Sequence, residues 1–421
     1  MATAAQKRQR QNPCTPEAAA SMVPTEWTLP ADLLLEIVAR SDIRTFVCCA
    51  ATCKLLRCDI LNPFFIRRVT QQGGIVPSCI LACLNINNSA KDPLPPLSLV
   101  HSDMPTARSL IDDSLGSFVS RNANEFLIEY YPVTSRGGLV LLCHRHPCSR
   151  RSGMCLYDPI IGKRTFLPKP PVTPDYVRCN SGCVLLTAAD GIDCYFLLFV
   201  GKQSSNGHAI KIQTCTSSTG TWGTIVIHDG FFLQKWPERR RKAIVLPGGI
   251  IHWLSDSGGK IITYDVRTAK PGQLEVTVLA FTNFKKGRLY LGSYSSPVGC
   301  GSRLLRLFRV DGFTISMWHQ LYDGGGWALE TVIDVEEKVR SLKPDIPADR
   351  HLQTTFMHPS ERSTIVFLQI NLRDVMADFH PQLVVLDLET KEIRVMQRLA
   401  LFSKLFEIDM PSRLRAMKIF L

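Results

Sequence analysis

Residues 155–168 read CLYDPIIGKRTFLP, which is an apolar run, a short turn and a second run rich in β-forming residues. β-branched and aromatic residues favour strands, whereas Asp, Pro and Gly favour the turn between them. Four later segments follow the same plan, at 212–227, 261–279, 306–321 and 383–399. Spacings of 43 to 69 residues separate the five markers, which are Asp158, Trp222, Asp265, Trp318 and Asp387. The sequence therefore predicts a strand–turn–strand unit that recurs five times.

Each unit is preceded by a further strand in which nearly every residue is apolar. The clearest examples are 138–142, 195–200, 249–254 and 364–368. Strands of this kind are covered on both faces, so the sheets must pack on one another. The average marker spacing, about 57 residues, is slightly longer than the ~40–50 residues of a propeller blade. We therefore predict an all-β, propeller-like domain of five or six blades with insertions; the alternative is a two-sheet β-sandwich assembly.

Residues 25–72 have a helical pattern instead. Pro30 suits the first turn of a helix, and two rows of residues four apart follow it, Leu33 with Ile37 and Leu34 with Val38. So short a segment buries too little of its own surface to be stable alone. Each Leu or Ile that a partner covers would gain about 1.5–3 kcal/mol. We therefore expect these residues to dock another protein in a helix-in-groove manner.

Two further helical segments complete the predicted three-helix domain. Residues 41–42 supply an N-cap for the second helix, which is expected to close with the positive charges of Lys54 and Arg57. The apolar face of the second helix carries Phe46, Cys49, Ala50 and Cys53. The third segment, residues 60–69, adds Leu61, Phe64 and Phe65.

Residues 29–69 resemble the F-box, the segment by which substrate receptors of SCF-type ubiquitin ligases hold a Skp-family adaptor. The matching residues are Leu29, Pro30, Asp32, Leu33, Leu34, Glu36 and Ile37, then Cys53 and Lys54. One position departs, because Leu56 stands where a tryptophan is common in the family. The resemblance implies adaptor binding by Leu29, Pro30, Leu33, Leu34, Ile37, Val38, Cys53, Lys54 and Leu56. The alternative is an ordinary helical subdomain that covers one end of the larger domain.

The strand-rich part is similar to the kelch-type F-box-associated domain of plant F-box proteins. The similarity rests on short pieces in order: 156–159, 162–164, 167–168, 249–254 with its His-Trp pair, and 262–265. It implies a substrate receptor subunit that is joined to a cullin through the adaptor and recruits a protein for ubiquitination. The sequence does not identify that substrate protein. A propeller binding module without a ligase role is the alternative.

Four parts are expected along the 421 residues: a disordered leader (1–24), the helical domain (25–72), a connecting segment (73–96) and the β-propeller-like domain (97–421). Three prolines in the connecting segment predict a semi-rigid spacer. The leader lacks the apolar core of a signal peptide, and no later run approaches the ~20 apolar residues that span a bilayer. We therefore expect a cytoplasmic or nuclear protein, or both, with no membrane partner.

The sequence offers no constellation for catalysis. It has no Gly-x-Ser-x-Gly elbow, no Walker loop and no His-Glu-x-x-His, which are the signatures of common nucleophile, phosphate and zinc sites. The glycine-rich run 322–327 lacks the lysine of a phosphate cradle, so we predict an inter-strand turn there. A non-catalytic protein without a cofactor is expected.

Fifteen cysteines are scattered along the chain. In a reducing compartment such residues are most simply small buried hydrophobes, as we expect for Cys48, Cys49, Cys79, Cys83, Cys183 and Cys194. A candidate zinc site is formed by Cys143, His144, His146 and Cys148. Structural zinc ligands usually come as two separated pairs, and strand alternation would point Cys143 away from the other three. No metal is expected.

The net charge of +12 raises nucleic acid as a partner. The densest basic stretch is 239–242, close to Trp236, whose ring could stack on a base. Such a run is more often a solvated loop or a nuclear import signal. Nucleic acid is therefore not the expected partner, and an acidic substrate protein is preferred to it.

Overall fold

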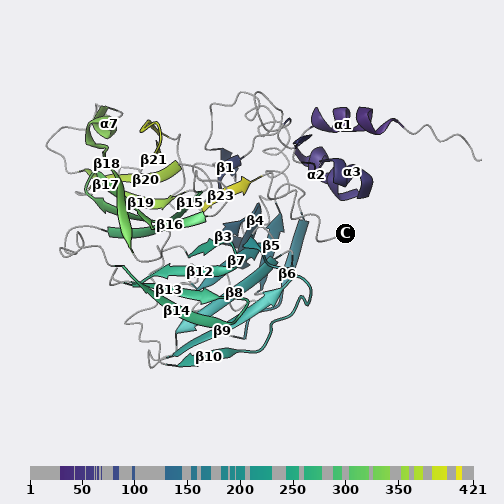
Figure 1. The fold of residues 1–421 in the computed structure, drawn as a ribbon, viewed down its shortest axis with the longest axis horizontal. Coiled ribbons are helices and arrows are strands. Elements are labelled where there is room, and N and C mark those ends of the chain that lie inside the picture. Colours follow the sequence, from purple (N-terminus) through teal and green to yellow (C-terminus); the bar gives the residue numbers. More distant parts are fainter. Residues whose placement is uncertain are drawn as a thin grey trace, which may run out of the picture.

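A computed structural model of the chain describes residues 29–41, 43–52, 54–60, 62, 64–65, 68, 79–84, 97–99, 129–144, 153–158, 163–171, 182–187, 190–194, 196–203, 209–229, 243–255, 260–276, 288–295, 303–321, 326–341, 352–359, 365–372, 382–395 and 404–409. Three helices come first along the chain, and strands make up most of the remaining described residues (Figure 1). The predicted leader, residues 1–24, lies outside the described residues.

The helices are α1 (Ala31–Ala39), α2 (Ile43–Thr52) and α3 (Lys54–Ile60). Helix α1 begins directly after Pro30, and the Ser41 hydroxyl donates to the Val38 carbonyl at its far end (2.8 Å). Residues 64–65 and 68 are also helical. The apolar side chains buried among these segments are Val38, Phe46, Ala50, Ile60 and Phe65.

One predicted helix boundary is wrong. Helix α2 ends at Thr52, and Lys54 and Arg57 belong to the separate helix α3. Arg57 still caps α2, because its Nε donates to the Ala50 carbonyl (2.9 Å) in the last turn. A basic side chain at this end of a helix satisfies an orphan carbonyl and complements the dipole. The proposed cap residue Asp42 is outside the described residues.

Five four-stranded antiparallel sheets form the bulk of the molecule, and each is a meander whose spatial order follows the sequence. Blade 1 consists of β3 (Tyr130–Arg136), β4 (Leu139–His144), β5 (Met154–Asp158) and β6 (Lys163–Leu167). Blade 2 consists of β7 (Cys183–Thr187), β8 (Phe196–Gln203), β9 (Ala209–Thr216) and β10 (Val226–Asp229). Blade 3 consists of β11 (Ile244–Leu246), β12 (Ile250–Leu254), β13 (Lys260–Asp265) and β14 (Lys270–Glu275).

The last two four-stranded blades follow the same plan. Blade 4 consists of β15 (Arg288–Ser295), β16 (Arg303–Asp311), β17 (Thr314–Gln320) and β18 (Trp327–Asp334). Blade 5 consists of β19 (Leu352–Pro359), β20 (Ile365–Leu372), β21 (Gln382–Asp387) and β22 (Ile393–Val395). A short helix, α7 (Glu336–Ser341), lies between them in the sequence.

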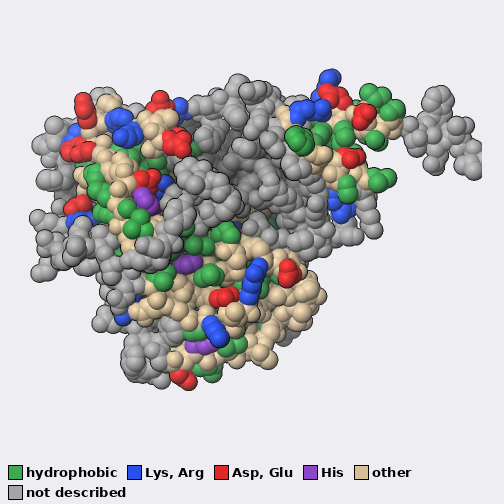
Figure 2. All heavy atoms as spheres, in the orientation of Figure 1, with side chains coloured by type: hydrophobic (Ala, Val, Ile, Leu, Met, Phe, Trp, Pro, Cys, Tyr) green, Lys and Arg blue, Asp and Glu red, His purple; other side chains and the backbone are tan. Residues whose placement is uncertain are grey.

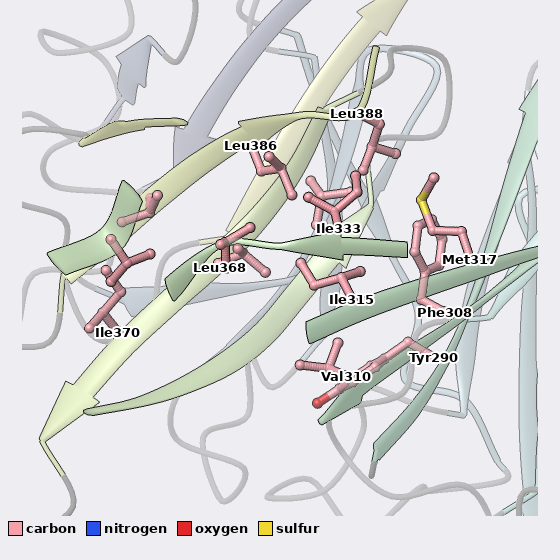
Figure 3. Close-up of a cluster of buried hydrophobic side chains, with 14 residues drawn as sticks. Tyr290, Phe308, Val310, Ile315, Met317, Ile333, Leu368, Ile370, Leu386 and Leu388 are labelled. Atoms are coloured by element: carbon pink, nitrogen blue, oxygen red, sulfur yellow. The ribbon is translucent and has the colours of Figure 1, made fainter. Parts of the chain in front are cut away.

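A separate hydrophobic cluster fills the space between each blade and the next. Between blades 1 and 2, for example, Leu141 packs with Leu185 and Leu198. Figure 3 shows the cluster between blades 4 and 5, where Ile315 and Ile333 lie close to Leu368. Consecutive meander sheets that pack face to face define a β-propeller. The predicted propeller is therefore confirmed in preference to a two-sheet sandwich.

A sixth sheet has three strands and joins distant parts of the chain. It contains β1 (Cys79–Leu84), β2 (Leu97–Leu99) and β23 (Lys404–Asp409), in the order β2-β1-β23. Strand β23 pairs with β1 along its whole length and also lies beside β3 of blade 1. The predicted five or six blades thus correspond to five four-stranded blades and this three-stranded sheet. Strand β1 lies within the predicted connecting segment, residues 73–96.

The fourth sequence repeat is out of phase with the others. Residues 306–321 contain β16 and β17, the second and third strands of blade 4, whereas the other four segments contain third and fourth strands. Trp318 is therefore not equivalent to Asp158. The glycine-rich run lies in sequence between β17 and β18, which pair, and the Leu321 amide donates to the Gly326 carbonyl (2.9 Å). Residues 322–325 of the predicted turn fall outside the described residues.

Candidate functional site

An apolar row is exposed along helix α1. Leu29, which precedes the helix, Leu33 and Ile37 lie four residues apart and are 51%, 52% and 55% exposed. Two large side chains beyond α1 are still more exposed, Leu55 of α3 at 79% and Phe64 at 76%. We call these five residues the helical apolar surface. Figure 2 shows hydrophobic side chains protruding over α1, α2 and α3, with charged side chains beside them.

The second predicted row faces the other way. Val38 is only 4% exposed and is part of the interior of the helical segment, so it is not exposed for the adaptor contact that was predicted for it, which stays a prediction. Leu34, in the same row, is half-buried, as is Leu56 of α3. Residues four apart share a helix face, and the structure shows that the row of Leu33 and Ile37 is the outward one.

The remaining predicted contacts lie around this surface. Pro30 is exposed at the start of α1. Cys53 falls outside the described residues, and Lys54 is described only as the first residue of α3. The structure therefore brings Leu29, Pro30, Leu33 and Ile37 together on one exposed face.

Leu55 is not among the predicted contacts. A signal for it is present in the sequence, because Leu55 and Leu56 are neighbours and a short helix cannot turn both inward. Arg57 and Ile60, three residues apart, are buried and mark the inner face of α3. Leu55 is about 160° around the helix from Arg57 at ~100° per residue, which places it on the outer face.

Ion pairs connect helix α1 to residue 68 of the same helical segment. The Glu36 carboxylate accepts from Arg40 (2.8 Å) in the same helix and from Arg68 (3.0 Å). The Arg68 guanidinium also lies over the ring of Phe65, 5.2 Å from its centroid. Exposed ion pairs contribute little stability, about 0–1 kcal/mol. Their effect here is geometric, since they tie residue 68 to α1.

The cysteines divide into two groups. Cys48 and Cys58 are exposed on the helices, so the prediction that Cys48 is buried is wrong, and Cys49 is half-buried. Cys183 and Cys194 are buried between blades, as predicted, and Cys79 and Cys83 are described only as strand residues. Burial raises the pKa of Cys155 to about 12, which makes such a thiol unreactive.

The predicted zinc ligands are only partly described. Cys143 and His144 lie in β4 and are both buried, whereas His146 and Cys148 fall outside the described residues. Within the described ranges, no group of three or more His, Cys, Asp or Glu side chains is placed to hold a metal ion.

A buried ion pair connects the first three blades. Arg136, at the end of β3, donates to both carboxylate oxygens of Asp190 (2.8 and 2.5 Å) and to the Val245 carbonyl of β11 (2.9 Å). Asp190 also accepts from the backbone amide of Thr187 at the end of β7 (2.8 Å). Each carboxylate oxygen of Asp190 therefore has a donor. Because the partners come from β3, β11 and the end of β7, the ion pair is a structural link between the first strands of three blades.

No helix in the described part of the chain combines the length and apolarity needed to cross a bilayer. No family model matches the chain, and no curated protein matches it.

Solved structures of low sequence identity do match. One is a protein from Lactobacillus plantarum (11% identity, covering 76% of this chain and 82% of that one, TM-score 0.33). Another is the Nup133 β-propeller domain of Vanderwaltozyma polyspora (15% identity, 67% and 71% coverage, TM-score 0.35). A third is the β-propeller domain of the Trilobed protease from Pyrococcus furiosus (8% identity, 64% and 84% coverage, TM-score 0.30). At these scores the likenesses carry no information about function.

Proposed function

We propose that the protein is the substrate receptor subunit of an SCF-type ubiquitin ligase. In this proposal the helical segment is an F-box that docks a Skp-family adaptor and, through it, a cullin. The β-propeller recruits a protein for ubiquitination. The observation that carries the proposal is the helical apolar surface, whose five side chains are exposed in the free chain.

The energetics favour a protein partner for this surface. Covering the remaining exposed area of each of its five side chains would contribute on the order of 1–2 kcal/mol. Part of that gain offsets the loss of translational and rotational freedom on association. Isolated exposed leucines need no explanation, but five large apolar side chains exposed on a small helical segment are typical of an interaction site.

The proposed subunit is not itself catalytic. It would hold a substrate lysine near a charged ubiquitin carrier, which accelerates transfer by raising the effective concentration of the reacting groups. Such a role needs neither a cofactor nor a metal, and it would be carried out in the cytoplasm, the nucleus or both.

A β-propeller binding module without a ligase role is the second candidate. Two observations favour it: Leu56 occupies the position where a tryptophan is common in the F-box family, and Val38 is turned into the helical interior. Both reduce the apolar area that an adaptor could cover.

The docking proposal is tested by Leu33→Asp in the full chain, co-expressed with a Skp-family adaptor. A carboxylate in the centre of the α1 row would be desolvated on docking, so we expect the adaptor to be lost from pull-downs. The matched control is Ile227→Asp on β10, because Ile227 is equally exposed (53%) but lies in the propeller. Adaptor retention by Leu33→Asp would remove the docking proposal.

The two candidate functions differ in what the wild-type chain carries with it. A ligase subunit purifies with both the adaptor and a cullin, and both are lost together in Leu33→Asp. A simple binding module purifies with neither.

A further inference from the structure

The outer strands of the five blades differ in how their edges are protected. Strands β10 and β22 have only four and three residues, β6 presents exposed Lys163 and Arg164, and β14 contains Pro271 near its start. Shortness, charged side chains, proline and β-bulges are the usual devices that keep an edge strand from pairing with another chain. Strand β18 is longer, with eight residues, and has neither a proline nor a basic side chain.

Strand β18 is protected by acidic side chains and by a β-bulge, and the bulge gathers apolar side chains on one face. The register shifts between Met317 and Trp318, so that Leu329 pairs with Trp318 and Val332 pairs with Ser316. Leu329 and Val332 therefore share a face although they are three residues apart, because the bulge adds one residue between them. They are 56% and 51% exposed. With half-buried Trp327 they form what we call the β18 patch.

The surroundings of the β18 patch place it at the mouth of one inter-blade space. Trp318, on the same face of the sheet, belongs to the cluster between blades 3 and 4, and Trp327 packs against that cluster. Across the described ranges, β18 is the last strand of its sheet and nothing pairs with its outer edge. Figure 2 shows hydrophobic side chains at the surface over β17 and β18, with acidic and basic side chains around them.

The segment that contains the β18 patch is acidic, in contrast to the whole chain. Residues 326–341 carry four acidic and two basic side chains, in a protein of net charge +12. Two of the acids are paired, Glu330 with Arg306 (2.7 Å) and Glu336 with Arg340 (2.9 Å). Arg309 of β16, in register with Ser316 and through it with Val332, is paired with Asp311 (3.6 Å). Asp334, two residues after Val332 on the same strand, adds a carboxylate that none of these ion pairs uses.

We propose that the β18 patch binds an extended peptide segment of another protein, in which apolar residues alternate with lysine or arginine. Apolar side chains of the peptide would cover Leu329 and Val332, a basic side chain would face Asp334, and its backbone would pair with the open edge of β18. Strand addition of this kind takes affinity from main-chain hydrogen bonds and specificity from side-chain contacts. The inference rests on the proposed recruiting role of the propeller and names the chemistry of the recruited segment.

The test is a selection of short random peptides displayed on phage, with the full chain as the target. We expect the enriched peptides to alternate apolar and basic residues. Their affinity, measured with synthetic copies by fluorescence anisotropy, should fall at least tenfold for the double variant Leu329→Asp/Val332→Asp. It should be unchanged for Ile227→Asp, which places the same charge on another outer strand. Because both replaced side chains are exposed, the melting temperature should stay close to that of the wild type.

A milder variant keeps the test valid should the charged pair disturb the fold. Leu329→Gln/Val332→Thr removes apolar surface while retaining strand-compatible side chains, and the same loss of peptide affinity is expected. Adaptor pull-down with either double variant should be normal, which separates a failure of this inference from a failure of the docking proposal.

Three results would overturn the inference. Enriched peptides could bind both double variants as tightly as the wild type, or they could be acidic. Alternatively, the wild-type chain could self-associate in sedimentation experiments through an interface that both double variants abolish, which would assign the patch to a second copy of this chain.

Discussion

Arg136 and Asp190 illustrate how much one buried pair can determine. Removing one partner of a buried ion pair leaves the other charge without compensation, which costs about 3–5 kcal/mol. We expect Arg136→Ala to lower the free energy of unfolding by that amount in urea denaturation, because Asp190 is only 2% exposed. Arg136→Met/Asp190→Leu should recover most of the loss. A single variant as stable as the wild type would show that the pair does not hold blades 1 to 3 together.

His252 makes stability depend on pH. Burial lowers the pKa of His252 from 6.5 to about 4, so the folded chain keeps this imidazole neutral while the unfolded chain protonates it below pH 6.5. Protonation of His252 therefore has no effect on the free energy of unfolding above pH 6.5. As the pH falls from 6.5 towards 4, it lowers that free energy by up to about 3 kcal/mol. We expect His252→Leu to have a flatter stability profile between pH 7 and 4, measured by urea denaturation. Parallel profiles for the two proteins would contradict the assignment.

Single residues also mark the limits of the sequence prediction. The two rows on α1 could be predicted from spacing alone, but spacing is the same for Leu33 with Ile37 as for Leu34 with Val38. Which row faces inward is decided by Phe46, Ile60 and the other buried side chains of the helical segment. Such contacts between helices cannot be inferred from the spacing of apolar residues within one helix.

At the level of elements, two hairpins between third and fourth strands have turns that an aspartate stabilises. The Asp265 carboxylate accepts from the amides of Arg267 and Thr268 (2.8 and 3.3 Å), and the Asp387 carboxylate accepts from those of Glu389 and Thr390 (2.9 and 3.3 Å). Aspartates at the start of a turn favour this geometry. Two of the repeat markers found in the sequence thus have a physical role.

The last residue of three such turns, in blades 2, 3 and 5, has a left-handed backbone conformation. Gly220 has φ +64°, and Ala269 and Lys391 have φ +54° and +57° at the corresponding positions of blades 3 and 5. A side chain in this region costs roughly 1–2 kcal/mol. We expect Ala269→Gly to raise the free energy of unfolding by about 1 kcal/mol, less the added entropy of the unfolded glycine.

Gly220→Ala provides the reciprocal measurement, since nothing lies within 4 Å of the added Cβ and only backbone strain is introduced. It should destabilise the chain by a similar amount. Equal stability of both variants and the wild type in urea denaturation would show that these turns can adopt another conformation.

For the whole molecule, the sequence predicted the repeated blades but not the sheet that joins the first strand, β1, to the last strand, β23. Alternating strands and turns are local, so the meander blades can be inferred from them. The pairing of Cys79 with Asp409 joins residues at opposite ends of the strand-rich region, and no local pattern specifies it. The phase error in the fourth repeat has a similar origin, because the turn at 312–313 between β16 and β17 looks like the turns that elsewhere join third and fourth strands.

In the proposed complex, the helices dock the adaptor and the propeller recruits the substrate. Hydrogen exchange measures that division directly, because amides of a helix become protected when a partner covers it. The full chain is compared with and without a purified Skp-family adaptor at saturating concentration. We predict slower exchange across α1 and around Leu55 and Phe64, with exchange in blades 1 to 5 unchanged. Unchanged exchange across α1, or protection confined to the blades, would contradict the docking proposal.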